Sequence, residues 1–313
     1  MICTTLAQAE ALVTAAGLDL AAVSLIISEA LDEDLGGRGV LPAGAGAGLD
    51  VTSHATIPAA QSAHAEFVVR ESGTVAGLPV AGYAMATVCA QAGDFHIILH
   101  ATDGDRVRRG DVLISVTGNA RALLTAERVA LNLITMMSGV ATATRAWVEA
   151  LAGTNTKVRD SRKTLPGLRM LQKYAVRVAG GTNHRMSLAD AALIKDNHVI
   201  AAGGVVEAYR AVRQSFPDVP VEVEVTSAEQ ARQVVAAGAT EILLDNMSPD
   251  VMAGIVAELA ELATFEASGG LALLNAAEVA RTGVNFVAVG AITHSAPALD
   301  IALDFLLESE ERG

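Results

Sequence analysis

The run VEVEVTSAEQARQVVAAGATEILLD at residues 221–245 decides the fold class of this chain. It contains a strand pattern at Val221–Val225, a helical pattern at Ser227–Ala237 and a second strand pattern at Ile242–Leu244. A helix that joins two short strands is typical of a β-α-β unit, in which the strands run parallel. The middle of the second half of the chain is therefore predicted to be α/β.

The same alternation continues on both sides of this run. Further strand patterns lie at Thr156–Arg159, Ala192–Ile194, Leu262–Phe265 and Phe286–Val289, and another helical pattern lies at Pro249–Ala260. Repeated alternation indicates either a parallel α/β barrel or a doubly wound sheet, and the pattern alone leaves both open.

The first half of the chain has a different, mixed pattern. Residues 7–32 carry a helical pattern interrupted near Gly17, and a Gly-rich stretch at 36–48 has the composition of a loop. Strand patterns follow at Ala65–Val69, Gly73–Val75 and Phe95–His100. Residues 121–152 form a long helical pattern, with a break expected at Ser138-Gly139, and bridge the two halves.

Composition excludes several classes of protein. The 313 residues suit one large domain or two modest ones. A formal net charge of −13 argues against a nucleic-acid partner, but not against small anions, which respond to local charge. Cys3 and Cys89 are the only cysteines, so no disulfide framework is expected. The N-terminus lacks a signal-peptide pattern and every apolar run is too short to span a bilayer, which predicts a soluble cytoplasmic protein.

Charged residues stand where most strands of the second half are predicted to end. In chain order the residues at these ends are Asp160, Lys195, Glu224, Asp245, Glu266 and Gly290. Active sites of parallel α/β folds lie at the carboxyl ends of the strands. Charge at nearly every end therefore favours a functional site over solvated strand ends.

The strongest local signal is a basic run from Arg159 to His198. Residues 157–185 hold 8 of the chain's 22 basic residues in 29 positions, and Asp160 is the only acidic residue among them. In an acidic protein such a block predicts a pocket for a polyanion, because Arg suits carboxylates and Lys suits phosphate. A solvated basic face or a regulatory patch is the alternative, and the short Gly-bounded segments of the run argue against it.

Two carboxylates complement this basic run. Glu224 and Asp245 end neighbouring strand patterns and are predicted to hold a divalent metal such as Mg²⁺ together with substrate oxygens. Glu222 shares the face of Glu224 by the two-residue period of a strand. It is either functional or a structural partner of a barrel Lys or Arg.

Glycine-bearing turns follow the last two strand patterns, with EASGGL at 266–271 and AVGAITHS at 288–295. Backbone N–H groups at such turns bind phosphate in barrel folds, and ordinary strand–helix turns are the alternative. His294 is expected to contact phosphate or cap a helix, and His184 to bind a ligand. His54, His64, His96 and His100 are expected to be structural or surface residues. Zinc-peptidase, P-loop and nucleophile-elbow motifs are missing from the sequence.

Together, an ordered set of motifs resembles the nicotinate-nucleotide pyrophosphorylase (carboxylating) family, also called quinolinate phosphoribosyltransferases. In the first half the matching motifs are EDLG at 33–36, DVTS at 50–53, VAGL at 75–78 and LLTAERVALNLITMMSGVATAT at 123–144. In the second half they are DSRKTLPGLRMLQKYAV at 160–176, GGTNHRMSLAD at 180–190, LIKDNH at 193–198, VEVEV, LLDN at 243–246, EASGG and GAITHS.

This resemblance implies a fold and a reaction. The fold is an N-terminal α/β sandwich at residues 1–127, joined by a C-terminal helix at 297–313, and an open, TIM-like α/β barrel at 128–296. The implied transferase moves phosphoribosyl from phosphoribosyl pyrophosphate to quinolinate with Mg²⁺ as cofactor. Its products are nicotinate mononucleotide, pyrophosphate and CO₂, in de novo NAD biosynthesis. A homodimer or dimer-based oligomer is implied, with no nucleic-acid or membrane partner.

The resemblance also assigns individual residues. Quinolinate contacts fall on Arg162, Lys163, His184, Arg185 and Lys195, with Arg128 donated by the neighbouring subunit. Metal and ribose contacts fall on Glu224 and Asp245, which form the implied catalytic set with Lys163 and Lys195. The 5′-phosphate contacts fall on Ser268, Gly269, Gly270, Gly290 and His294.

Two other functions remain open at this stage. One is a molybdenum-transport-associated homologue with the same fold and a different substrate, which the complete RKT, NHR and KDNH set disfavours. The other is a non-catalytic sensor of a nucleotide or pyridine acid, which the intact pair Glu224 and Asp245 disfavours.

Overall fold

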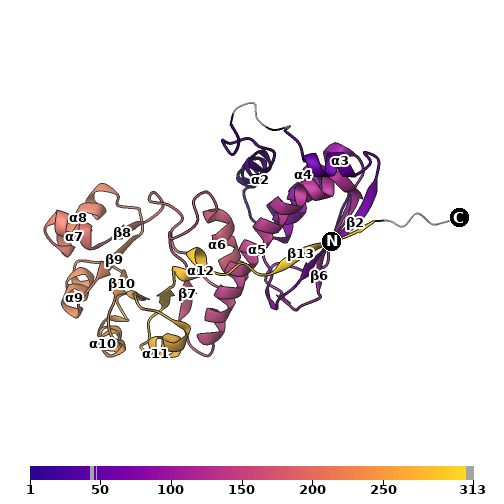
Figure 1. Ribbon diagram of the computed structural model, residues 1–313. Coiled ribbons are helices and arrows are strands. Elements are labelled where there is room, and N and C mark those ends of the chain that lie inside the picture. Colours follow the sequence, from indigo (N-terminus) through magenta and orange to yellow (C-terminus); the bar gives the residue numbers. More distant parts are fainter. Residues whose placement is uncertain (43–45, 47, 308–313) are drawn as a thin grey trace. The chain divides into compact units, whose positions relative to one another are not determined.

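The computed structural model describes residues 1–42, 46 and 48–307, which form two units (Figure 1). The first unit contains Met1–Thr142, Met170–Ala179 and the described residues from 296 onward, and the second contains Ala143–Arg169 and Gly180–Ser295. Residues 43–45 and 47 of the predicted Gly-rich loop lie outside the described residues. None of the described helices is long and apolar enough to cross a membrane.

The first unit is built on an antiparallel sheet in the order β1-β4-β6-β2-β13. Its strands are β1 (Ile2–Cys3), β2 (Ser62–Val69), β4 (His96–Leu99), β6 (Val112–Asn119) and β13 (Ile301–Leu307). Alternate residues Ala63, Ala65 and Phe67 of β2 are buried, and α4 (Leu78–Ala92) contacts β4 and β6. A half-buried sheet with helices against it is the predicted α/β sandwich.

Smaller elements complete this unit. They are α1 (Leu6–Ala15), α2 (Leu20–Asp34), α3 (Val51–Thr56), the two-strand ribbon of β3 (Gly73–Thr74) and β5 (Arg106–Val107), and α6 (Arg169–Val178). The predicted helix break near Gly17 is confirmed, because Gly17 has a φ of +73° between α1 and α2.

The C-terminal segment is a strand, so the predicted helix at 297–313 is wrong over β13. Ile301–Leu307 pair antiparallel with β2, in a register from Ile301↔Val69 to Leu307↔Ala63. The backbone groups along the outer side of β2 would otherwise be an unpaired sheet edge. Tertiary pairing therefore overrides the helical tendency of this Leu-rich stretch. Residues 308–313 lie outside the described residues.

The predicted break at Ser138-Gly139 is also wrong, because α5 (Ala120–Ala150) runs through it. Ser138 is fully buried, and its Oγ accepts from Ala76 N at 3.0 Å and donates to Ala76 O at 3.2 Å. A Cβ atom at Gly139 would lie 2.1 Å from the carbonyl oxygen of Pro297. Both residues serve close packing of the helix against neighbouring backbone. The boundary predicted between residues 127 and 128 lies inside α5.

The second unit is a parallel sheet in the order β7-β12-β11-β10-β9-β8. Its strands are β7 (Lys157–Arg159), β8 (Ala192–Ile194), β9 (Val221–Val225), β10 (Glu241–Asp245), β11 (Thr264–Ser268) and β12 (Phe286–Ala288). Its helices are α7 (Asp196–Ala202), α8 (Val205–Ser215), α9 (Ala228–Ala236), α10 (Pro249–Leu259), the 3₁₀ turn η1 (Leu273–Asn275), α11 (Ala276–Arg281) and α12 (Ala291–His294).

Strand order decides between the two predicted α/β folds. β8 to β12 follow one another across the sheet in chain order, and β12 then pairs with β7. A doubly wound sheet would reverse its order in the middle, whereas a barrel does not. Within the described residues β7 and β8 do not pair, and Thr182 bridges to Arg159 on β7 instead. The unit is the predicted open α/β barrel.

Among the barrel strands, β11 differs most from its predicted position. The prediction ended this strand at Phe265, but β11 extends to Ser268 because it pairs with β10 from Glu241↔Thr264 to Asp245↔Ser268. Leu262, which was expected to start it, is 61% exposed. Glu266 therefore lies inside the strand and not at its end.

Candidate active site

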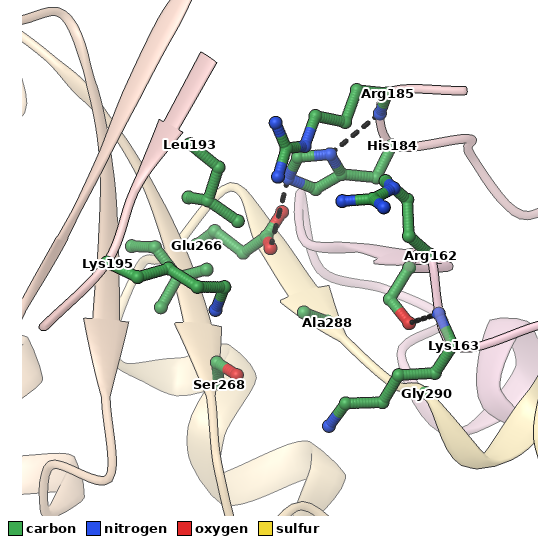
Figure 2. Close-up of a pocket in the computed structure, with 12 residues that line it drawn as sticks. Arg162, Lys163, His184, Arg185, Leu193, Lys195, Glu266, Ser268, Ala288 and Gly290 are labelled. Atoms are coloured by element: carbon green, nitrogen blue, oxygen red, sulfur yellow. Dashed lines mark hydrogen bonds and ion pairs between the residues drawn. The ribbon is translucent and has the colours of Figure 1, made fainter. Parts of the chain in front are cut away.

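A cavity of about 290 Å³ lies at the carboxyl ends of the barrel strands. Its lining residues are Ser161, Arg162, Lys163, His184, Arg185, Leu193, Lys195, Leu243, Glu266, Ser268, Ala288 and Gly290. Figure 2 shows Lys195 and Leu193 on one side of this space and Arg162 and Lys163 on the other. The basic run and the later strands thus meet at one pocket, as the sequence predicted.

Four cations surround the cavity. Arg162 and Lys163 follow β7, Arg185 follows the segment that bridges to β7, and Lys195 follows β8. Burial, followed by the nearby charge of Arg162, lowers the pKa of Arg185. Repulsion between like charges in a pocket is relieved when an anion binds there. The cavity is therefore suited to a ligand with more than one negative charge.

Buried polar contacts hold the two loops that carry these cations. Asp160 is fully buried, and its carboxylate accepts from Asn183 Nδ2 at 2.6 Å and from the backbone N–H of His184 at 2.9 Å. Arg169 donates from Nε to Thr164 Oγ1 at 3.1 Å and from Nη1 to Met186 O at 3.0 Å. These bonds link the loop after β7 to the loop at 183–186.

A layer of buried charges lies against the cavity. Arg159 Nη1 is 2.9 Å from Glu266 Oε2 and 3.9 Å from Glu222 Oε1, and His184 Nε2 is 2.5 Å from Glu222 Oε2. Burial, followed by repulsion from Glu222, raises the pKa of Glu266 to about 7. Glu222 is thus a partner of a barrel Arg, which was one of its two predicted roles. The sequence analysis placed Glu266 among the charged strand ends and Arg159 at the start of the basic run, but it did not predict that the two residues pair.

The predicted metal carboxylates lie on neighbouring strands beside the cavity. Glu224 on β9 is opposite Leu243, and Asp245 on β10 is opposite Ser268; both of these partners line the cavity. Glu224 Oε2 is 2.6 Å from Lys195 Nζ, and Asp245 Oδ2 accepts from Asn246 Nδ2 at 2.8 Å.

The donor chemistry of this pair suits Mg²⁺. Glu224 Oε1 and Asp245 Oδ1 make no hydrogen bond with any residue that the structure describes. Mg²⁺ prefers one or two carboxylates supplemented by substrate phosphate oxygens and water. His184, Glu222 and Glu266 also bring ligand atoms within 4.8 Å of one another, but the guanidinium of Arg159 already contacts both carboxylates there.

The predicted phosphate loops lie at the ends of β11 and β12. Ser268 and Gly290 line the cavity, whereas Gly269, Gly270 and His294 do not. Gly269 has a φ of +86°, and a Cβ atom there would lie 2.1 Å from Asn246 Oδ1, so this site favours Gly. A Cβ atom at Gly290 would lie 2.9 Å from Lys163 Cδ and would displace that side chain. The exposed His294 bonds through Nδ1 to Ser295 Oγ at 2.5 Å.

Arg128 is the predicted site residue that lies in the first unit. It is on α5, its side chain is 62% exposed, and its Nη2 is 3.8 Å from Glu127 Oε1. The predicted residues that share the cavity are Arg162, Lys163, His184, Arg185, Lys195, Ser268 and Gly290.

Fold and site together define an open α/β barrel whose mouth holds a cation-lined cavity suited to a multiply charged anion. Models of the N-terminal and C-terminal domains of quinolinate phosphoribosyl transferase match residues 50–138 and 140–304. The chain belongs to this family.

Similar proteins from bacteria agree with this assignment. The chain is 50% identical over 261 residues to the nicotinate-nucleotide pyrophosphorylase [carboxylating] of Mycobacterium leprae, covering 82% of this chain and 91% of that protein. It is 42% identical over 264 residues to a probable enzyme of the same name from Bacillus subtilis, covering 83% and 89%. The crystal structure of NadC from Streptococcus pyogenes has a TM-score of 0.85 and 35% identity, covering 93% of this chain and 99% of that chain.

Proposed function

We propose that this chain transfers phosphoribosyl from phosphoribosyl pyrophosphate to quinolinate and removes a carboxylate. The products are nicotinate mononucleotide, pyrophosphate and CO₂, which makes it an enzyme of NAD biosynthesis. The observation that carries the proposal is the convergence of four cations on one cavity whose adjoining strand ends carry Glu224 and Asp245. Family membership supports the same reaction.

The cationic side of the cavity suits quinolinate. The two adjacent ring carboxylates need several donors, and Arg162, Lys163, Arg185 and Lys195 supply them. The planar guanidinium groups match carboxylates with paired N–H donors, and the lysines add point charge. Leu193 provides an apolar contact for the pyridine ring.

The acidic and Gly-bearing side suits the sugar phosphate. Glu224 and Asp245 would hold Mg²⁺ together with pyrophosphate oxygens of the substrate. When bound, this ion supplies positive charge that stabilises the departing pyrophosphate. Ser268 and Gly290 lie in the cavity wall where the 5′-phosphate is expected to bind, and Gly269, Gly270 and His294 adjoin them.

The reaction follows from these two halves. The bond between C1 of the ribose and the pyrophosphate oxygen breaks, and the carboxylates stabilise the positive charge that develops on the sugar. The pyridine nitrogen, oriented by the cations, forms the new bond to C1. The bond from C2 to its carboxylate then breaks, releasing CO₂, and the electron pair stays at C2 beside the positive ring nitrogen until C2 takes a proton. Positioning and fixed charge supply most of the acceleration.

A homodimer completes this proposal. Arg128 is exposed on α5, as a residue donated to a neighbouring subunit must be. It would add a further cation to the quinolinate side of the partner's pocket. The cytoplasmic location stays a prediction.

The reaction is tested by incubating the protein with quinolinate, phosphoribosyl pyrophosphate and Mg²⁺, with nicotinate in a parallel tube. We expect nicotinate mononucleotide from quinolinate and little or none from nicotinate, which lacks the second carboxylate. Turnover of nicotinate alone, or binding of quinolinate in a calorimeter without any product, would contradict the proposal. The second result would indicate the non-catalytic sensor.

A further inference from the structure

Two hydrogen bonds of the His184 ring define its tautomer, and its Nε2 also lies 3.9 Å from Glu266 Oε1. Its Nδ1 is 2.7 Å from the backbone N–H of Arg185, which can only donate, so Nδ1 is an acceptor without a proton. Its Nε2 is 2.5 Å from Glu222 Oε2, so the single ring proton lies on Nε2 and points toward this carboxylate. A ring in this state is neutral. Its nitrogens face Arg185 and the buried layer, and they do not offer a charge to the cavity.

The carboxylate that receives this proton is itself fixed. Glu222 is buried on β9 and lies beside Arg159 of β7, whose Nη1 pairs with Glu266 of β11 at 2.9 Å. The guanidinium carbon of Arg159 lies 3.5 Å from the ring centre of Phe286 on β12. Four parallel strands thus support one small cluster of side chains, and strands hold such a cluster more rigidly than loops do.

The backbone beside the ring is fixed as well. The N–H of His184 donates to the buried Asp160, and Arg185 Nη1 donates to Ala191 O at 2.8 Å. The ring of His184 therefore lies between the buried cluster and the backbone of Arg185. Moving the ring would move the segment that carries the Arg185 guanidinium.

We propose that Arg159, Glu222 and Glu266 form a buried clamp that positions His184 as a neutral Nε2–H tautomer and, through it, Arg185. The proposal rests on the proposed function in one respect, because Arg185 is taken to bind a carboxylate of quinolinate. His184 is then a positioning residue and not one of the substrate-binding cations. This differs from the role that the family resemblance implied for it.

Kinetics of matched variants tests the clamp. In Glu222→Ala the ring proton loses its acceptor, and we expect the KM for quinolinate to rise about tenfold or more while kcat and the KM for phosphoribosyl pyrophosphate change by less than about threefold. Glu222→Gln keeps an oxygen acceptor and should recover most of the lost affinity. A KM for quinolinate unchanged in Glu222→Ala, or a loss as large in Glu222→Gln, would overturn the clamp.

A control histidine lies in the first unit. His64 Nε2 is 3.3 Å from Glu66 Oε1, so His64→Asn breaks a similar contact away from the barrel. This variant should keep wild-type constants for both substrates. Equal effects of His64→Asn and Glu222→Ala would mean that the kinetic change is a general loss of stability, which contradicts a positioning role.

A second measurement needs no turnover. Protein labelled with ¹⁵N-histidine, with the His184 signals identified by their loss in His184→Asn, reports which ring nitrogen carries the proton. We expect a bare Nδ1 and a protonated Nε2 at neutral pH, with and without quinolinate and in the absence of phosphoribosyl pyrophosphate. Two protonated nitrogens, or a shift of these signals on adding Mg²⁺ alone, would overturn the proposal. If the tautomer held but the enzyme made no nicotinate mononucleotide, the proposed function would fail and the clamp would stand.

Discussion

Arg185 is the residue through which the quinolinate side of the site is most directly tested. Its guanidinium lies in the cavity next to Arg162, and burial lowers its pKa. A charged hydrogen bond contributes on the order of 2 kcal/mol, so Arg185→Ala should lower kcat/KM for quinolinate about 30-fold. The KM for phosphoribosyl pyrophosphate should stay nearly constant. Arg213→Ala, an exposed cation on α8, is the control and should behave as wild type. An equal loss of affinity for quinolinate and for phosphoribosyl pyrophosphate would mean that Arg185 is not specific to the quinolinate side of the site.

Glu266 makes the stability of the barrel depend on pH. Its pKa is near 7 in the folded protein against an ordinary value of 4.5, so unfolding releases a proton between these limits. Stability contributed by the protonated form is therefore present below pH 4.5 and lost as pH rises toward 7. Relative to Glu266→Gln, the wild type should lose on the order of 3 kcal/mol of unfolding free energy over this range. Urea melts at several pH values measure the difference, and a constant difference would contradict the assignment.

Much of the site could be predicted residue by residue, because charge is visible in sequence. The basic run and the strand-end positions marked this part of the chain, and the family resemblance selected Arg162, Lys163, Arg185 and Lys195 within it, which share the cavity. The buried pairing of Arg159 with Glu266 could not be predicted, since it joins strands more than a hundred residues apart. The sequence signal for this pairing was Glu266, a carboxylate within a strand of otherwise uncharged residues.

Within helices, a glycine is required where neighbouring backbone leaves no room for a Cβ atom. Gly139 lies inside α5, where a Cβ atom would be 2.1 Å from Pro297 O and 3.0 Å from Ala298 Cα. Gly139→Ala should therefore destabilise the protein by about 1–3 kcal/mol despite the better helix propensity of Ala. Gly254 in α10 is the matched control, because nothing lies within 4 Å of its Cβ position. Gly254→Ala should raise stability by up to about 1 kcal/mol in the same thermal melts. The reverse order would show that α5 is not tightly packed there.

Sequence patterns fail for elements whose partner lies far away in the chain. Barrel strands β9 and β10 were predicted correctly because alternating valines mark β9, a short apolar run marks β10, and helical patterns flank both. β13 was predicted as a helix because its partner, β2, lies more than 200 residues earlier in the chain. A sequence pattern identifies a strand or helix correctly when the elements it packs against are close in sequence. It fails for a strand such as β13, which forms only because it pairs with a strand far away in the chain.

For the whole molecule, the proposed dimer predicts that two different site variants can restore activity when they form a mixed dimer. If Arg128 acts in the neighbouring subunit's pocket, a mixed dimer of Arg128→Ala and Arg185→Ala has one site with both changes and one with neither. Co-expression of the two impaired variants in equal amounts should then raise activity to about a quarter of that of the wild type, since half the dimers are mixed and each has one intact site. No recovery in purified mixed dimers would place Arg128 in its own subunit's site.

The fate of one carbon tests whether this barrel mouth carries out a decarboxylating phosphoribosyl transfer. Quinolinate carrying ¹³C in the 2-carboxylate is mixed with phosphoribosyl pyrophosphate, Mg²⁺ and the protein, and both products are measured. Labelled CO₂ and unlabelled nicotinate mononucleotide should form in equal amounts. Label that stays in the pyridine product, or release of CO₂ without the nucleotide, would contradict it.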